Sequence, residues 1–82
     1  MHYGGFMKSI TISLEKMDSI HRFVKIVEKY PFDIDIKSKR YVIDAKSLLG
    51  VCSLDTSIPV TLEIHSDNCD KLIQELDPFI VR

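Results

Sequence analysis

Residues 41–54, YVIDAKSLLGVCSL, change their hydrophobic pattern within a few positions. In residues 41–45 the side chains alternate between two faces, which is the two-residue period of a β-strand. The apolar run that follows is short and is interrupted by Gly50, so it predicts a helix of only a few residues. Ser47 stands at the start of this run, where a serine hydroxyl can cap a helix. The stretch therefore predicts a strand that leads directly into a short, serine-capped helix.

The residues before this stretch predict a strand and then a helix. Residues 8–14, KSITISL, alternate apolar and polar side chains, as in a half-buried strand. Residues 15–30 change to a spacing of three and four, which predicts an amphipathic helix. We expect Asp18 or Ser19 to cap this helix and Pro31 to stop it.

Two further strands and a final helix complete the pattern. Residues 32–37, FDIDIK, alternate again and predict a hairpin with residues 40–45. Residues 60–65, VTLEIH, predict a fourth strand, and Pro78 is expected to end or kink the last helix. That helix is expected to start at a polar residue and to bury four apolar ones: Ser66, Asp67 or Asn68 at the start, then Cys69, Leu72, Ile73 and Leu76.

The order of these elements predicts an α+β fold. Strand, helix, strand, strand, helix, strand and helix follow one another, which favours a four-stranded antiparallel sheet with three helices on one face. A chain of 82 residues is long enough for one core only. We expect a single domain at residues 7–82, preceded by a flexible leader at residues 1–6.

Composition excludes several classes of function. Eleven basic and twelve acidic residues give a net charge of -1, so neither nucleic acid nor a membrane surface is an expected partner. No apolar run approaches the roughly 18 residues of a membrane span. Cys52 and Cys69, without a secretory signal, predict reduced thiols and a cytoplasmic protein. His2, His21 and His65 are not clustered with the cysteines, so we expect no metal and no cofactor.

Residues 41–54, followed by VTLEI and a C-terminal helix, resemble HPr, the histidine-containing phosphocarrier protein of the bacterial sugar phosphotransferase system. In that family a segment of the form KS-apolar-apolar-G-apolar-apolar-SL opens the second helix, and residues 46–54, KSLLGVCSL, match it almost continuously. The resemblance runs from about Met7 to Ile80. It implies the HPr-like open-faced β-sandwich and a role that is not enzymatic.

The second motif of that family, GIHARPA, carries the histidine that accepts phosphate, and this chain departs from it. When the first strand and the EKY at residues 28–30 are aligned, the loop is shorter, and residues 15–18, EKMD, occupy the region. No histidine then stands at the phosphoacceptor position. A second register aligns SIHRF with the motif and makes His21 the phosphoacceptor, with Arg22 after it and no proline. The chain resembles a divergent paralogue whose phosphohistidine loop is shortened or lost.

The resemblance also implies a regulatory role for Ser47. In the family, this serine is the target of a kinase/phosphorylase, and the phosphorylated protein is a corepressor of a catabolite-control transcription factor. A phosphate there would add about two negative charges at the positive end of a helix dipole. The residues beside Ser47 would form the surface that binds protein partners: Lys46, Leu48, Leu49, Val51 and Cys52.

Three functions therefore remain open. The first is a regulatory or protein-interaction module of the phosphotransferase-system type, with Ser47 as its phosphorylation site and with system enzymes, the kinase or the transcription factor as partners. The second is a phosphocarrier that uses His21. The third is a structural or oligomerising domain in which neither residue is phosphorylated.

Overall fold

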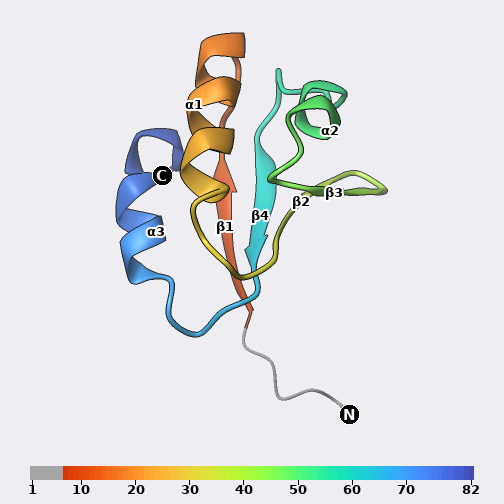
Figure 1. Ribbon diagram of the computed structural model, residues 1–82. Helices are drawn as coiled ribbons and strands as arrows, with labels where there is room; N and C mark the ends of the chain where they lie inside the picture. Colours follow the sequence, from red (N-terminus) through yellow and green to blue (C-terminus); the bar gives the residue numbers. More distant parts are fainter. Residues whose placement is uncertain (1–6) are drawn as a thin grey trace.

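The computed structural model describes residues 7–82, and the expected leader at residues 1–6 lies outside them (Figure 1). The predicted order of elements and the α+β class are confirmed. None of the helices described in residues 7–82 is long and apolar enough to cross a membrane. The elements are β1 (Lys8–Ile12), α1 (Met17–Val27), β2 (Ile34–Ser38), β3 (Tyr41–Asp44), α2 (Leu48–Cys52), β4 (Val60–Ile64), α3 (Asp70–Glu75) and the 3-10 helix η1 (Asp77–Phe79).

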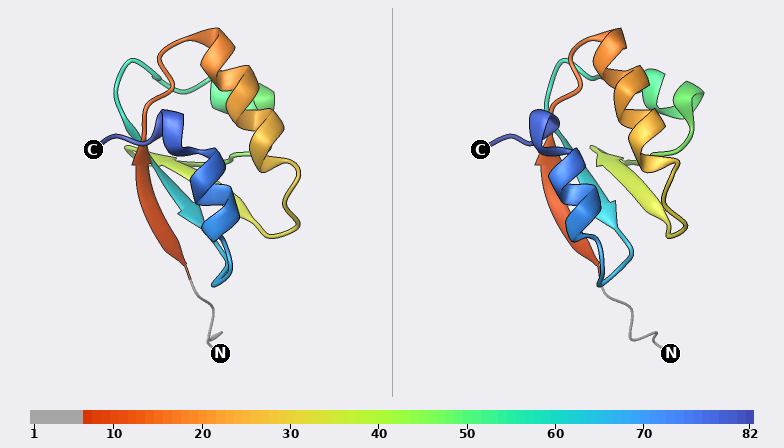
Figure 2. Two further views of the ribbon diagram at one scale, coloured as in Figure 1. Left: turned by 90° about the vertical axis from the view of Figure 1, so that its left-hand side faces the viewer. Right: turned by 60° about the vertical axis from the view of Figure 1, so that its left-hand side comes forward.

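The four strands form one antiparallel sheet in the order β1-β4-β2-β3. One row of isoleucine and leucine side chains crosses all four strands, since Leu62 lies between Ile10 and Ile36, and Ile36 also faces Ile43. The three helices pack on one side of this sheet, with α1 and α3 side by side and α2 beside α1 (Figure 2). The opposite side of the sheet carries mostly polar side chains.

A single apolar cluster joins the helices to the sheet. Phe23 of α1 is fully buried at its centre, and its ring meets the ring of Phe79 nearly edge-on at a centroid distance of 6.1 Å. The alternating residues of β2 and β4 supply the floor of the cluster: Ile34, Ile36, Val60, Leu62 and Ile64. This burial is the main favourable contribution to folding.

Two helix starts differ from the sequence prediction. The prediction that Asp18 or Ser19 caps α1 is wrong, because Lys16 has the extended backbone of the N-cap position and Asp18 lies inside the first turn. An acidic residue there faces the positive end of the helix dipole. The last helix, α3, has Cys69 at its N-cap and begins later than expected. Ser66 instead closes a turn by accepting a hydrogen bond from the backbone N–H of Asn68.

Tyr30 connects three parts of the fold after α1 ends. Its hydroxyl donates a hydrogen bond to Glu75 of α3, and its backbone carbonyl accepts one from Lys46 Nζ at 2.6 Å. Lys29 Nζ also binds Glu75, at 2.8 Å. The hydrogen bond to Glu75, together with burial and the carboxylate charge, raises the pKa of Tyr30 to about 12. Hydrogen bonds from Lys29 and Tyr30 lower the pKa of Glu75.

Replacing Glu75 with alanine is expected to bring the pKa of Tyr30 from about 12 back towards the ordinary value of 10.0, because the acceptor and its charge are both removed. The folded-state pKa is raised, so this hydrogen bond stabilises the fold below pH 10.0 and is lost as the pH rises through about 12. Tyrosinate absorbance, compared with that of Tyr30→Phe, measures the titration. Gln74→Ala on the same helix is the control, and a shift of the same size in that variant contradicts the assignment.

Candidate functional site

Ser47 lies at the start of α2 with its hydroxyl exposed. Its backbone is extended, at φ -95° and ψ 106°, and its Oγ accepts a hydrogen bond from the backbone N–H of Gly50 at 3.2 Å. The backbone N–H of Ser47 donates to the carbonyl of Asp44 at 3.0 Å, so the end of β3 holds the cap in place. The predicted role of this serine as a helix cap is confirmed.

The five residues expected to bind partners differ widely in exposure. Leu49 is 85% exposed, whereas Leu48 and Cys52 are half-buried. Val51 is fully buried in the core, because α2 turns that side towards α1 and the sheet, so it offers no surface to a partner. Lys46 is half-buried, and its ammonium group donates to the carbonyl of Tyr30.

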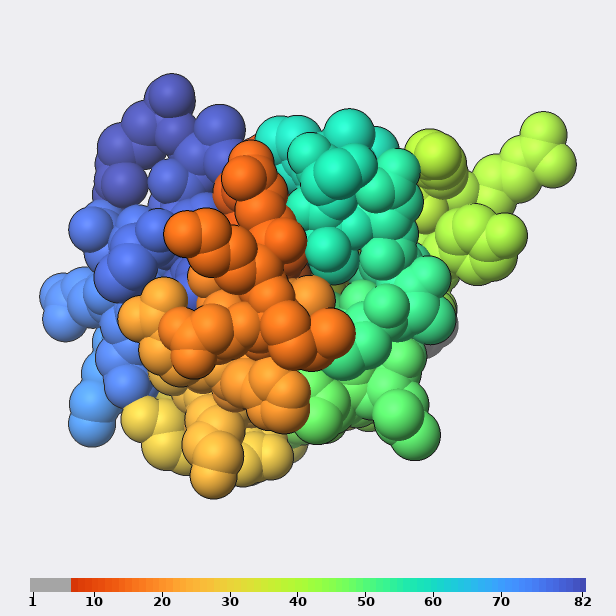
Figure 3. Space-filling view, turned by 90° about the horizontal axis from the view of Figure 1, so that it is seen from above, coloured from red at the N-terminus to blue at the C-terminus, as the bar shows by residue number. Residues whose placement is uncertain are grey.

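Met17, at the start of α1, extends the apolar surface beyond α2. Its side chain is 57% exposed, and its Sδ lies 3.6 Å from Cys52 Sγ. Figure 3 shows the start of α1 beside α2 on the same face of the molecule. We call the exposed Met17 and Leu49, together with the half-buried Leu48 and Cys52, the α1–α2 patch. Sequence reasoning missed Met17, because its contact with α2 joins residues 35 positions apart.

Residues 15–18, which one of the two sequence registers aligns with the phosphohistidine motif of HPr, lie at the N-terminus of α1. A hollow of about 430 Å³ lies here, and its lining in residues 7–82 includes Lys16 but no histidine. The charges around it are mixed, since Glu15 and Asp18 line it together with Lys16 and Arg22. Asp18 Oδ2 lies 3.3 Å from Arg22 Nε, so the guanidinium already has a carboxylate partner.

His21 lies one turn inside α1, and its side chain is exposed. Only the first four backbone N–H groups of a helix lack a partner inside it, and the N–H of Ile20 already donates to the carbonyl of Lys16 at 3.0 Å. A group attached to His21 would therefore find no backbone N–H donors from the first turn. Arg22, Lys25 and Ile26 surround the histidine on the helix surface.

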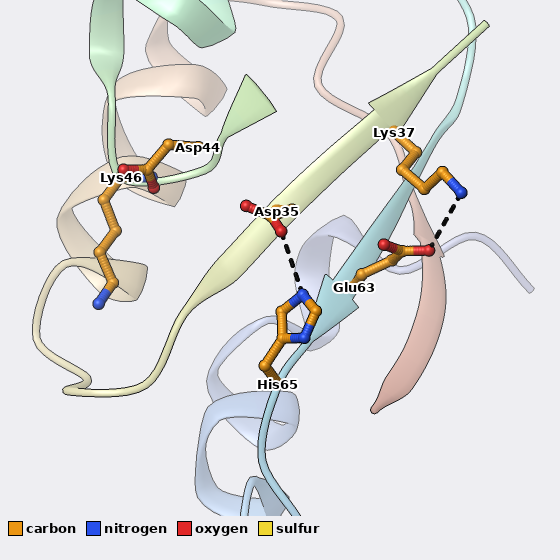
Figure 4. A network of polar contacts seen from close by, with 6 residues as sticks. All are labelled: Asp35, Lys37, Asp44, Lys46, Glu63 and His65. Atoms are coloured by element: carbon orange, nitrogen blue, oxygen red, sulfur yellow. Dashed lines mark hydrogen bonds and ion pairs between the residues drawn. The ribbon is translucent and has the colours of Figure 1, made fainter. Parts of the chain in front are cut away.

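The polar side of the sheet holds two side-chain contacts that the sequence analysis did not predict, a histidine–carboxylate hydrogen bond and an ion pair (Figure 4). His65 Nε2 lies 3.1 Å from Asp35 Oδ2, and Lys37 Nζ lies 3.5 Å from Glu63 Oε2. Both pairs join β2 to β4 or to the residue that follows it. Within residues 7–82 no group of three or more His, Cys, Asp or Glu side chains could hold a metal ion. The ammonium group of Lys37 offsets the carboxylate of Glu63 on this side of the sheet.

Comparison with known proteins identifies the fold. No family model and no curated protein matches the chain. The crystal structure of HPr-C-His from Thermoanaerobacter tengcongensis matches with a TM-score of 0.73 at 24% identity, covering 87% of this chain and 88% of that one. The phosphocarrier protein HPr from Bacillus anthracis str. Ames matches with a TM-score of 0.64 at 18% identity, covering 96% and 100%. The chain therefore has the HPr fold, as its resemblance to that family implied.

Proposed function

We propose that this protein is a regulatory or protein-interaction module of the phosphotransferase-system type, and that it binds its partners through the α1–α2 patch. The observation that carries the proposal is the position of Ser47, an exposed residue that caps α2 two residues before the exposed Leu49. An apolar surface with a modifiable group at its margin suits a regulated contact with another protein. The contact surface consists of Met17, Leu48, Leu49 and Cys52, without the buried Val51.

Phosphorylation of Ser47 is compatible with the fold. The hydroxyl is exposed, so a kinase can reach it without unfolding the domain. Phosphate oxygens can accept hydrogen bonds from the unpaired N–H groups of the first turn of α2, where the helix dipole also favours negative charge. The new charge would stand at the edge of the α1–α2 patch and would change which partners bind there, since partners with acidic rims would be repelled.

The alternative is a phosphocarrier that uses His21. The side chain of His21 is exposed, so a phosphoryl donor can reach it. The position of His21 inside α1 counts against it, because the phosphoryl group would lack the backbone donors that a helix N-terminus supplies. The two functions also differ in chemistry. Phosphoserine is stable in acid, whereas phosphohistidine is not.

Incubation with ATP and an HPr kinase is expected to add one acid-stable phosphate, detected by intact-mass measurement and absent in Ser47→Ala. Ser53→Ala is the matched control at the other end of the same helix, where the Ser53 hydroxyl donates to the carbonyl of Gly50 at 2.6 Å. This control should be phosphorylated like the unchanged protein. Ser47→Ala removes a helix cap and should lower the free energy of unfolding by about 1 kcal/mol. Circular dichroism must therefore show that this variant is folded.

Two results would overturn the proposal. One is the absence of phosphate after incubation with the kinase, or its retention in Ser47→Ala. The other is an acid-labile phosphate transferred from phosphoenolpyruvate by the first enzyme of the phosphotransferase system and lost in His21→Ala. The second result would establish the carrier function.

A further inference from the structure

The two edges of the sheet are covered differently. The C-terminal residues lie along one end of β1, where the N–H of Val81 donates to the carbonyl of Thr11 at 2.9 Å and Ile80 bridges to Ile12. At the other edge, β3 pairs with β2 alone among the elements of residues 7–82. Tyr41 and Val42 of β3 are 63% and 58% exposed. Figure 3 shows the hairpin that carries them projecting from the body of the molecule.

The backbone of β3 can form another ladder on its open side. The N–H of Ala45, directly after β3, donates to the carbonyl of Ile34 in β2 at 2.9 Å. Backbone groups of successive residues point to opposite sides of an antiparallel strand, so those of Val42 and Asp44 point away from β2. The carbonyl of Asp44 accepts from Ser47, which leaves the Asp44 N–H and both groups of Val42 directed at the open edge.

Self-pairing of this edge places opposite charges against each other. If two copies meet antiparallel about a two-fold axis at Val42, the two Val42 residues exchange hydrogen bonds. Tyr41 of each copy then stands opposite Ile43 of the other, and Arg40, in the turn directly before β3, comes to the end of the pairing beside Asp44 of the other copy. Opposite charges and apolar pairs across strands are favourable. A shift of the register by two residues instead places Asp44 against Val42 and loses both charge pairs.

Asp44 Oδ1 accepts a hydrogen bond from the backbone N–H of Lys46 at 2.9 Å, but no cation faces Asp44 in the β2–β3 pairing. It lies directly opposite Asp35 in the β2–β3 pairing, and like charges in that arrangement are destabilising. His65 Nε2 lies 3.1 Å from Asp35 Oδ2, on the side of β2 that faces β4, so the histidine is a partner of Asp35. An arginine from a second copy would supply the cation that Asp44 lacks among its cross-strand neighbours.

We propose that β3 pairs with β3 of a second copy, so that one continuous sheet runs through a two-fold dimer. The contact is a short strand with few apolar side chains, so the dimer is weak, with a dissociation constant on the order of 10⁻⁵ M. This surface consists of the β3 edge and is separate from the α1–α2 patch. Its existence does not depend on phosphorylation of Ser47.

Sedimentation velocity tests the proposal. Residues 1–82 are measured at concentrations from about 1 µM to 1 mM, a range that brackets the expected dissociation constant. Arg40→Glu brings a glutamate beside Asp44 of the other copy, and the two-fold axis repeats this repulsion at both ends of the contact. The dissociation constant is expected to rise by about tenfold. Asp44→Arg should have a similar effect. The double variant Arg40→Glu with Asp44→Arg exchanges the two charges and should return the constant to within about threefold of the original.

Lys25→Glu changes the net charge by the same amount as Arg40→Glu but lies on the exposed side of α1, so it should leave the dissociation constant unchanged. Arg40 lies exposed in the hairpin turn, and its substitution should not disturb the core. A monomer at every concentration overturns the proposal, as does a dimer that Arg40→Glu leaves intact. A dimer lost in Leu48→Asp but kept in Arg40→Glu also overturns it and places self-association at the α1–α2 patch.

Discussion

Replacing Phe23 with alanine is expected to lower the free energy of unfolding by about 3–5 kcal/mol. The side chain is fully buried, and its ring packs edge-on against Phe79 of η1, so its removal leaves a cavity where α1 meets the C-terminal turn. Domains are stable by only about 5–15 kcal/mol, and small ones bury a smaller share of their surface than large ones. The substitution should therefore remove most of the stability, measured as the shift of the urea midpoint by circular dichroism.

His21→Ala is the matched control, since it removes an exposed ring from the same helix. It should change the free energy of unfolding by no more than about 0.5 kcal/mol. An equal loss in the two variants would contradict the burial of Phe23 and the exposure of His21. A stable His21→Ala protein also makes the phosphoenolpyruvate experiment interpretable, because loss of phosphate could not then be attributed to unfolding.

The order of the elements could be predicted because it depends on hydrophobic spacing, which is local. Residues 60–64 alternate in the sequence, and the same residues alternate between buried and half-buried positions in β4. The helix starts could not be placed from local preference. Asp18 is a better N-cap residue than Lys16, yet the connection from β1 brings Lys16 to the cap in an extended conformation. The bond from the N–H of Ser13 to the carbonyl of Phe79, at 2.8 Å, fixes that connection from a distant part of the chain.

Some features of the candidate site are also local and could be predicted, whereas others depend on contacts between distant residues. The cap at Ser47 could be predicted, since the bond from Gly50 spans three residues. The contrast between the exposed Leu49 and the buried Val51 could not, because α2 has five residues and is too short for its periodicity to indicate a face. The contact between Met17 and Cys52 and the pair of His65 with Asp35 join residues at least 30 positions apart. Such pairs depend on the packing of the whole domain.

Gly50→Ala is expected to lower the free energy of unfolding by about 1–3 kcal/mol, although alanine favours a helix over glycine by about 1 kcal/mol. An added Cβ would lie 2.7 Å from the branch methyl Cγ2 of Ile43 and 3.2 Å from Ser47 Oγ. Neither neighbour can move freely, because Ile43 lies in β3 and Ser47 caps α2. Chemical unfolding measures the loss, and an unchanged midpoint would show that α2 moves away from β3 without cost.

A second substitution separates this steric cause from a general weakening of α2. Ile43→Leu keeps the volume of the side chain but removes the branch at Cβ, and with it the methyl group that blocks residue 50. In the Ile43→Leu background, Gly50→Ala should lower the free energy of unfolding by at least about 1 kcal/mol less than it does in the unchanged protein. A double-mutant cycle measures this difference. An equal cost in both backgrounds would mean that Ile43 is not the obstacle. The glycine in KSLLG is thus explained by the close approach of α2 to Ile43 of β3.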